Sequence, residues 1–389
     1  MDSWPTLPLF VRHNDSRSKS LPNNVTVAIR RPNRVCEIDL VLPSWSESMG
    51  SIVEAIQEPF QSLERIRITV KNATGPPILV REAFLGGSAP HLRVIKLDGI
   101  AFPFPEIRRV FSSSANILVE LHLANIPDDV YFSPRDLVTS LTTLVQLKRL
   151  TVDFHSPPSP PFPIVTPPQR TTLPSLTSLK FRGAREYLEE FVAQIDLPAL
   201  CKIEIGLFND IFFEIPQFYQ FISCSNALSS LTWALVTYSE ESVSIDFDQR
   251  GKSTNECYSL EASCRRLDWQ LSFVTQISSQ LSPLLSSVRS LTIQSIDRFP
   301  TGEEDVDSTQ WVEFFQPFTH VTEVEVWKEK LLPGIVQALV AEDLTPEIVL
   351  PELTSLCLKG YRRSPSVAKA AEQFVATRRL SGRTVYLTG

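Results

Sequence analysis

The chain has 389 residues, enough for two or three domains or for one long array of repeats. Hydrophobic residues make up 43% and charged residues 21%, which are globular values and argue against extensive disorder, collagen and a bare coiled coil. The net charge of −7 argues against a strongly basic protein that coats nucleic acid.

A short pattern, apolar-x-x-apolar-x-apolar, recurs along the chain. Its copies are Val35/Ile38/Leu40, Leu63/Ile66/Ile68, Leu92/Ile95/Leu97, Leu118/Leu121/Leu123, Leu147/Leu150/Val152, Leu176/Leu179/Phe181, Leu200/Ile203/Ile205, Leu228/Leu231/Trp233, Val288/Leu291/Ile293, Val321/Val324/Val326 and Leu353/Leu356/Leu358. Up to Leu228 the copies are about 28 residues apart, within the range of leucine-rich repeats. The last two apolar positions are two residues apart, so they lie on one face of a short strand.

Between these strands, apolar residues recur at spacings of three and four, which predicts amphipathic helices. The segments are 51–60, 104–112, 134–144, 187–195 and 217–224. Units of strand and helix bury their apolar faces by stacking, so we predict an α/β fold, a leucine-rich-repeat-like solenoid. Such a solenoid is a curved horseshoe with parallel strands on its concave face and helices on its convex face. Because the units are irregular and lack an Asn or Cys ladder, an ordinary multi-layer α/β domain is the alternative.

We divide the chain into an N-terminal flank or cap, residues 1–34, and the solenoid, residues 35–389. Two alternating segments, 242–247 and 258–263, flank a polar, turn-rich stretch and predict a β-hairpin excursion at about 242–263. The segment 156–168 carries seven prolines in thirteen residues, which favours an extended loop. This loop is either a stiff surface connection or a docking site for an SH3 or WW module.

Motifs for catalysis and for metal binding are lacking. Gly251-Lys252-Ser253 resembles part of a phosphate-binding loop, but Asp246 stands where that loop requires its first glycine. GxSxG, HExxH and GxGxxG are absent, and no histidine shares a helix turn with another His or Cys. We therefore expect no catalytic residue, no metal site and no cofactor, and we expect that the protein is not an enzyme.

The sequence also lacks signals for a membrane or for secretion. No run of 18 apolar residues is present, and Met1 to Pro8 has no charged region followed by an apolar one. The six cysteines are scattered and form no CxxC pair, as in proteins of a reducing compartment. We expect a cytoplasmic or nuclear protein, with no membrane partner and no nucleic-acid partner.

The residues between the core positions of the strands form rows across the predicted concave face. In repeats two to seven most of these residues are basic: Arg65, Arg67, Lys96, His122, Arg149, Lys180, Arg182 and Lys202, interrupted by Asp98, Glu120 and Asp153. Later repeats contribute Ser290, Thr292, Glu323, Glu325 and Trp327, so the face changes from basic to acidic. The basic part predicts a protein partner that is acidic or phosphorylated. The competing interpretation is a solvated face with chance clustering.

Three longer segments carry a family resemblance. They are LPSLTSLKFRGAREYLEEFVAQIDLPAL at 173–200, CRRLDWQLS at 264–272 and FVATRRLSGRTVYL at 374–387, with Glu58-Pro59-Phe60 and Tyr131-Phe132-Ser133-Pro134 before them. In this order and spacing the chain resembles the F-box/leucine-rich-repeat-like proteins expanded in mushroom-forming (basidiomycete) fungi.

The resemblance implies a solenoid that selects protein substrates, as the substrate-binding part of a cullin-type ubiquitin ligase receptor. Most members carry an N-terminal F-box that grips a Skp-type adaptor. Residues 1–24 have too few helical apolar residues for an F-box, and prolines interrupt them, so adaptor binding is in doubt for this chain. The hypothesis is a non-catalytic protein-recognition solenoid. The alternative is a free-standing protein-binding scaffold unrelated to ubiquitination.

Overall fold

The computed structural model describes residues 7–14, 23–42, 47–71, 78–80, 83–156, 170–208, 215–223, 231–248, 257–296, 308–327, 329–340 and 349–389. The chain forms two compact units, Met1–Leu200 (unit 1) and Cys201–Gly389 (unit 2). The predicted proline-rich loop, beyond Ser156, lies outside the described residues.

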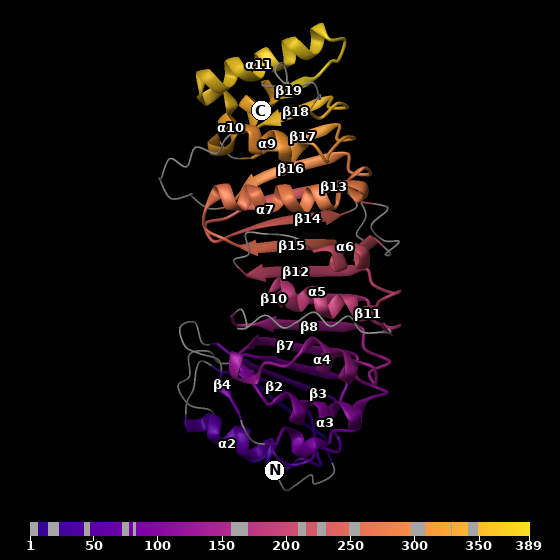
Figure 1. Cartoon of the computed structure of the whole chain (residues 1–389). Coiled ribbons are helices and arrows are strands. Elements are labelled where there is room, and N and C mark those ends of the chain that lie inside the picture. The colour runs from indigo at the N-terminus through magenta and orange to yellow at the C-terminus, as the bar shows by residue number, and fades with distance from the viewer. Residues whose placement is uncertain are drawn as a thin grey trace. The chain divides into compact units, whose positions relative to one another are not determined.

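Unit 1 contains a parallel sheet with the strand order β1-β2-β3-β5-β7-β8-β10 (Figure 1). Its strands are β1 (Leu9–Asn14), β2 (Val35–Leu42), β3 (Arg65–Val70), β5 (Val94–Asp98), β7 (Glu120–Ile126), β8 (Arg149–Phe154) and β10 (Ser178–Gly183). Two short parallel pairs accompany it: β4 (Ile78–Leu79) with β6 (Ile100–Ala101), and β9 (Thr171–Thr172) with β11 (Ile195–Asp196). The helical segments are α1 (Asn23–Ile29), α2 (Glu47–Ala55), η1 (Leu85–Gly87), α3 (Phe104–Ser114), η2 (Asp128–Val130), α4 (Pro134–Leu141) and α5 (Arg185–Ala193).

The repeating apolar pattern forms the core of unit 1. Its middle positions are direct partners from β2 to β10 and are at most 1% exposed: Ile38, Ile66, Ile95, Leu121, Leu150 and Leu179. Burying one such side chain stabilises the fold by roughly 1.5–3 kcal/mol, so the row is a major source of stability. On the helix side, Tyr187 of α5 contacts Phe154 of β8, with ring centroids 4.9 Å apart.

A backbone ladder joins successive repeats just before their strands. The carbonyl of Arg93 accepts the amides of Val119 and Glu120, at 2.8 and 3.1 Å. The carbonyl of Val119 accepts the amides of Lys148 and Arg149, at 2.8 and 3.1 Å. The carbonyl of Lys148 accepts two amides of the next repeat in the same way. Main-chain hydrogen bonds therefore connect the repeats, in place of the Asn or Cys ladder that the sequence lacks.

Unit 2 contains a sheet with the strand order β12-β15-β14-β13-β16-β17-β18-β19. Its strands are β12 (Lys202–Phe208), β13 (Trp233–Tyr238), β14 (Ser242–Asp248), β15 (Cys257–Ser263), β16 (Ser290–Ser295), β17 (Glu323–Val326), β18 (Ser355–Leu358) and β19 (Tyr386–Thr388). The helical segments are α6 (Pro216–Ser223), α7 (Leu267–Gln280), α8 (Ser282–Leu285), α9 (Ser308–Phe315), η4 (Glu329–Leu331), α10 (Leu332–Val340), η6 (Tyr361–Arg363) and α11 (Pro365–Leu380). Among the pairings described for this sheet, those of β14 are antiparallel and the others are parallel.

The fold class is α/β with mostly parallel strands, as the repeat predicted. The predicted helices correspond to α2, α3, α4, α5 and α6, with ends that differ by at most five residues. Within the predicted flank 1–34, β1 pairs in parallel with β2 and α1 follows it. In the part of the chain that the structure describes, no helix combines the length and the apolar character needed to cross a membrane.

The antiparallel pair β14–β15 covers the two segments predicted to form a β-hairpin at about 242–263, and it lies within the sheet. β15 pairs with β12 along its whole length, and β14 pairs with β13. Both strands bury alternate apolar residues, including Ile245 and Leu260 at 0% and 6% exposure. One face of the pair is therefore apolar, and β14 packs against α7 (Figure 1).

The register of the eighth repeat differs from the expectation. Ala234 and Val236 are fully buried and pair with Leu291 and Ile293, whereas Trp233 lies on the opposite face of β13. The repeat is therefore Leu231/Ala234/Val236, three residues later than predicted, and Leu228 lies outside the described residues. A search for large apolar residues misplaces this copy because alanine fills its middle position.

Candidate functional site

The strand residues that alternate with the core of unit 1 form a second surface of its sheet, which we call the outer face of unit 1. Strand register places seven of the eight predicted site residues on it: Arg65 and Arg67 on β3, Lys96 on β5, His122 on β7, Arg149 on β8, and Lys180 and Arg182 on β10. Arg67 pairs with Lys96, and Lys96 with His122, so these three residues lie on neighbouring strands. The eighth, Lys202, begins β12 in unit 2, where its ammonium group is 2.7 Å from Glu204.

Glu120 is the centre of an ion network on the outer face of unit 1. Its carboxylate is 2.5 Å from the Lys96 ammonium group and 2.7 Å from the Arg149 guanidinium, and the residue is only 8% exposed. Burial by itself would raise the Glu120 pKa. The hydrogen bonds from Arg149 and Lys96 outweigh burial and hold this pKa at about 2. Lys96 and Arg149 are therefore committed to a carboxylate of the chain itself.

A second ion pair lies at the other end of this face. Arg12 of β1 donates from Nε to Glu37 at 2.8 Å, and Glu37 is 7% exposed. The hydrogen bond from Arg12 is the largest influence on the Glu37 pKa and lowers it. Sequence reasoning missed both residues. The outward positions of β2, at Glu37 and Asp39, were readable from the repeat pattern, whereas β1 was not predicted.

Arg65 and Arg67 have the least neutralised charges of this group. For the Arg65 side chain, the described residues provide neither a hydrogen bond nor an ion pair, and it influences Glu37 only through space. Arg67 reaches Asp39 at 3.5 Å, while its Nε is buried and has no hydrogen-bond partner among the described residues. Both side chains point outward from β3, so they offer adjacent guanidinium donors to an anion.

His122 and Asp153 have altered protonation on the same face. Partial burial is the largest influence on the His122 pKa and lowers it, so His122 is mostly neutral at pH 7 and does not add to the basic charge. Burial raises the pKa of Asp153 to about 6, although Arg182 and Lys180 act in the opposite direction. Nearby, Asn125 has a φ of 54° in an irregularity of β7 and donates to Asp98 at 2.6 Å.

The outer face of unit 1 is therefore mixed in charge rather than uniformly basic. Among the described strand residues, seven permanent cations lie on it, at Arg12, Arg65, Arg67, Lys96, Arg149, Lys180 and Arg182. Five carboxylates accompany them, at Glu37, Asp39, Asp98, Glu120 and Asp153. The structure brings the predicted cations together on one surface, but it pairs several with acids and leaves Arg65 and Arg67 as the strongest candidates for binding an anion.

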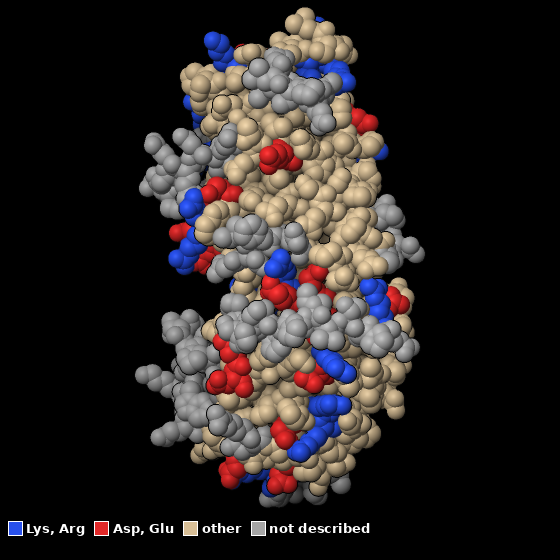
Figure 2. All heavy atoms as spheres, viewed as in Figure 1, with Lys and Arg blue, Asp and Glu red and all other residues tan. Residues whose placement is uncertain are grey.

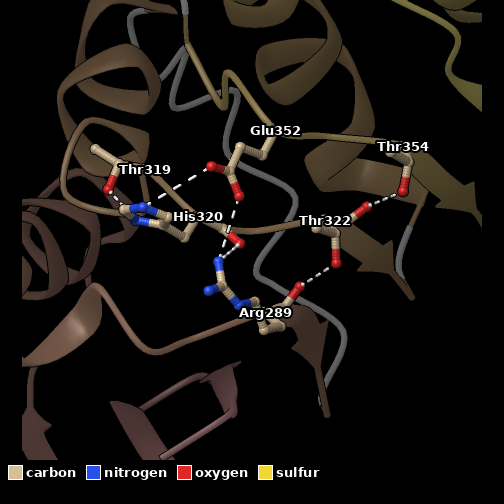
Figure 3. Close-up of polar contacts among 6 residues, drawn as sticks. All are labelled: Arg289, Thr319, His320, Thr322, Glu352 and Thr354. Atoms are coloured by element: carbon tan, nitrogen blue, oxygen red, sulfur yellow. Dashed lines mark hydrogen bonds and ion pairs between the residues drawn. The ribbon is translucent and has the colours of Figure 1, made fainter.

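A different polar cluster lies before the strands of unit 2 (Figure 3). Arg289 donates from Nη1 to the His320 carbonyl at 3.0 Å and approaches Glu352 at 3.3 Å. Thr322 donates its hydroxyl to the Arg289 carbonyl at 3.1 Å, and Thr354 donates to the Thr322 carbonyl at 3.1 Å. Arg289, Thr322 and Thr354 occupy equivalent positions in three successive repeats, so these hydrogen bonds connect the repeats.

The described residues contain no group of three or more His, Cys, Asp or Glu side chains placed to hold a metal ion. A cavity of about 20 Å³ lies in unit 2 between α6, α8 and the strands. Its lining surface is apolar, and it is lined by Ile203, Phe218, Ile222, Leu231, Phe247, Tyr258, Leu260, Leu281, Leu284 and Leu285. A space of this volume holds about one water-sized molecule, so it is not a cofactor site.

Comparison of the chain with protein-family models finds no match, and comparison with curated proteins finds no significant match.

Proposed function

We propose that the protein is a non-catalytic recognition module in which the outer face of unit 1 binds an acidic or phosphorylated segment of a partner protein. The observation that carries this proposal is the pair Arg65 and Arg67. They are adjacent outward residues of one strand, and neither is held by a close ion pair. The Arg67 side chain is 38% exposed, so the outer part of its guanidinium group can reach a phosphate or carboxylate of the partner.

The chemistry favours arginine over the neighbouring lysine for this role. A guanidinium group presents two parallel donors to a carboxylate or phosphate, and hydrogen bonds to charged groups contribute roughly 1.5–3 kcal/mol each. Lys96 and Arg149 would have to leave Glu120 to bind a ligand. Arg67 would give up only its 3.5 Å contact with Asp39.

We also propose the finer architecture, a leucine-rich-repeat-like solenoid in which parallel strands line a concave face and helices form the convex face of a horseshoe. Two features support this architecture within unit 1. The core positions are partners on successive strands, and the carbonyl ladder repeats once per strand. Small-angle X-ray scattering tests it, because a globular multi-layer domain of 389 residues would have a smaller radius of gyration.

On the family resemblance alone, we propose that this recognition serves a cullin-type ubiquitin ligase. Affinity-tagged full chain, mixed with a purified Skp-type adaptor and cullin, tests this part separately. Co-elution at stoichiometric ratio supports it. If the chain binds a partner protein but never the adaptor, the protein is instead a free-standing scaffold.

The recognition proposal is tested with an array of phosphoserine and phosphothreonine peptides and their unphosphorylated counterparts. The test variant is Arg65→Glu/Arg67→Glu, and the matched control is Arg108→Glu/Arg135→Glu, two exposed arginines of α3 and α4. We expect the test variant to lose more than about tenfold in affinity for the peptides that the native protein binds, because two charge-assisted contacts become repulsive. Equal loss in both variants would show long-range charge effects only and would contradict the site.

A further inference from the structure

The sheet of unit 2 also has a surface opposite to its core, which we call the outer face of unit 2, and its charge is opposite in sign. Strand alternation places six carboxylates on it, at Glu204, Asp246, Asp248, Glu261, Glu323 and Glu325. Among the described residues, the cations on this face are Lys202, on β12, and Lys359, directly after β18. Six carboxylates against two ammonium groups give these eight described residues a net charge of −4 when all are ionised. Around α7 and α9, by contrast, the helix side of this unit is mostly uncharged (Figure 2).

The two lysines neutralise only part of this face. Lys202 is 2.7 Å from Glu204. Glu261 is exposed, and its side chain makes neither a hydrogen bond nor an ion pair with the described residues. Burial raises the pKa of Asp246, and the neighbouring Glu261 and Glu204 also raise it, so these carboxylates act on one another across three strands. A cation bound there would relieve this repulsion.

Aromatic side chains lie on the same face. Trp327 directly follows β17 and is 52% exposed, and Tyr386 on β19 is 69% exposed. The Trp327 indole donates to Glu325 at 3.2 Å, and the Lys359 ammonium group lies 5.8 Å from the centroid of its ring. The chain therefore already holds one lysine against an aromatic ring whose edge is fixed by a carboxylate, an arrangement that suits further cations.

We propose that the outer face of unit 2 is a docking surface for an extended, lysine- and arginine-rich segment of a partner protein. The acids complement the charge of such a segment, and Trp327 and Tyr386 add faces for cation–π contact. The small side chains between the acids, such as Ser244 and Ser259, leave room for a chain to cross the strands. This site does not depend on the proposed anion site, because it uses a different unit and the opposite charge.

Fluorescence anisotropy with labelled peptides tests the proposal on the full chain. The probes are a peptide of alternating lysine and serine and a counterpart in which glutamate replaces lysine. We expect the lysine peptide to bind on the outer face of unit 2, and we expect its affinity to fall as NaCl rises from about 50 to about 300 mM, because the contacts are exposed. Any binding of the glutamate peptide belongs to Arg65 and Arg67 on unit 1 and should be lost in Arg65→Glu/Arg67→Glu. Binding to the glutamate peptide alone, or to neither peptide, would overturn the proposal.

The test variant is Glu261→Gln/Glu325→Gln, which removes two charges and preserves an acceptor for the Trp327 indole. The matched control is Glu313→Gln/Glu372→Gln, two exposed acids of α9 and α11. We expect at least about a fivefold loss of affinity in the test variant and less than about a twofold loss in the control. Equal losses in both variants would attribute binding to net charge and contradict a site on this face.

Two further variants separate the possible causes. Trp327→Leu should weaken lysine-peptide binding by about two- to fivefold if the ring contributes a cation–π contact. Arg65→Glu/Arg67→Glu should leave this binding intact, so failure of the anion site and failure of this one are distinguishable. If ultracentrifugation shows that the native protein forms a dimer that Glu261→Gln/Glu325→Gln disrupts, and the lysine peptide does not bind, the occupant is a second copy and the proposal fails.

Discussion

Arg289 and Glu352 lie 63 positions apart in the sequence, yet their side chains approach within 3.3 Å across three successive repeats of unit 2 (Figure 3). His320, from the repeat between them, lies 3.8 Å from the same carboxylate. All three side chains are about half exposed, so solvent screens the interaction.

We therefore predict that the Arg289–Glu352 ion pair contributes little to stability. A double-mutant cycle with Arg289→Ala and Glu352→Ala, measured by urea unfolding, should give a coupling energy of about 0.2–1 kcal/mol that decreases as salt increases. A salt-independent coupling well above this range would show that the pair is effectively buried.

Glu120→Gln should destabilise the protein by about 2 kcal/mol at pH 7, because Gln cannot retain the two charge-assisted contacts with Lys96 and Arg149. The Glu120 pKa lies at about 2 in the folded protein, below the ordinary value of 4.5. A lowered folded pKa gives stability that is present above pH 4.5 and lost as the pH falls towards 2. The difference in unfolding free energy between native protein and variant should shrink over this interval, and a constant difference would contradict the assignment.

Lys96→Glu should cost more stability than Lys180→Glu, although both are outward lysines of the same sheet face. Lys96 contacts the buried carboxylate of Glu120, so reversal of its charge places two acids together. Lys180 is exposed on β10. Chemical denaturation at pH 7 should show a loss of more than about 2 kcal/mol for the first variant and less than about 1 kcal/mol for the second.

Asp153→Asn should stabilise the protein at pH 8 by about 1–2 kcal/mol. Burial raises the Asp153 pKa to about 6 from an ordinary 3.8, so ionisation is harder in the folded state. The contribution of this residue to stability is complete below pH 3.8 and is lost as the pH rises through 6. The variant and the native protein should converge near pH 4 in thermal or urea unfolding. A destabilised variant at pH 8 would show instead that Lys180 and Arg182 need the charge.

Leu179→Ala should reduce the unfolding free energy by about 2–5 kcal/mol, because Leu179 is 1% exposed and belongs to the buried row that crosses the sheet of unit 1. Its neighbour Lys180 points outward, so Lys180→Ala should change stability by less than about 0.5 kcal/mol. Calorimetry of the two variants checks the face assignment directly, and the opposite order would invert it.

Most of the strands could be predicted from the sequence because their signal is local. Leu150 and Val152 are two residues apart and bury the same face whatever surrounds them. The register predicted for the repeat at Trp233 was wrong, because an alanine occupies the position where the pattern expects a large apolar residue. The pairing of β15 with β12 could not be predicted, because the alternation of apolar and polar residues identifies a strand but not the strands with which it pairs.

Seven of the eight candidate residues lie on the outer face of unit 1, whereas Lys202 lies on β12 of unit 2, and their side-chain interactions were not predictable. Repeat register determines which way Lys96 and Arg149 point, whereas side-chain rotamers determine that both reach Glu120. The sequence showed Glu120 as an interruption of a basic surface. In the structure it is the acid that neutralises two of the predicted cations, and this shifts the expected anion site to Arg65 and Arg67.

The position of β14 has a consequence for how such a sheet can grow. β12 is parallel to β15, β15 is antiparallel to β14, β14 is antiparallel to β13, and β13 is parallel to β16. Two reversals cancel, so every strand beyond the hairpin keeps the polarity it would have had if β12 and β13 were neighbours. A repeat protein of this kind can therefore gain or lose strands that are joined by turns, with no helix between them, only in even numbers. A single inserted strand would force the chain that follows to run the wrong way for every later repeat.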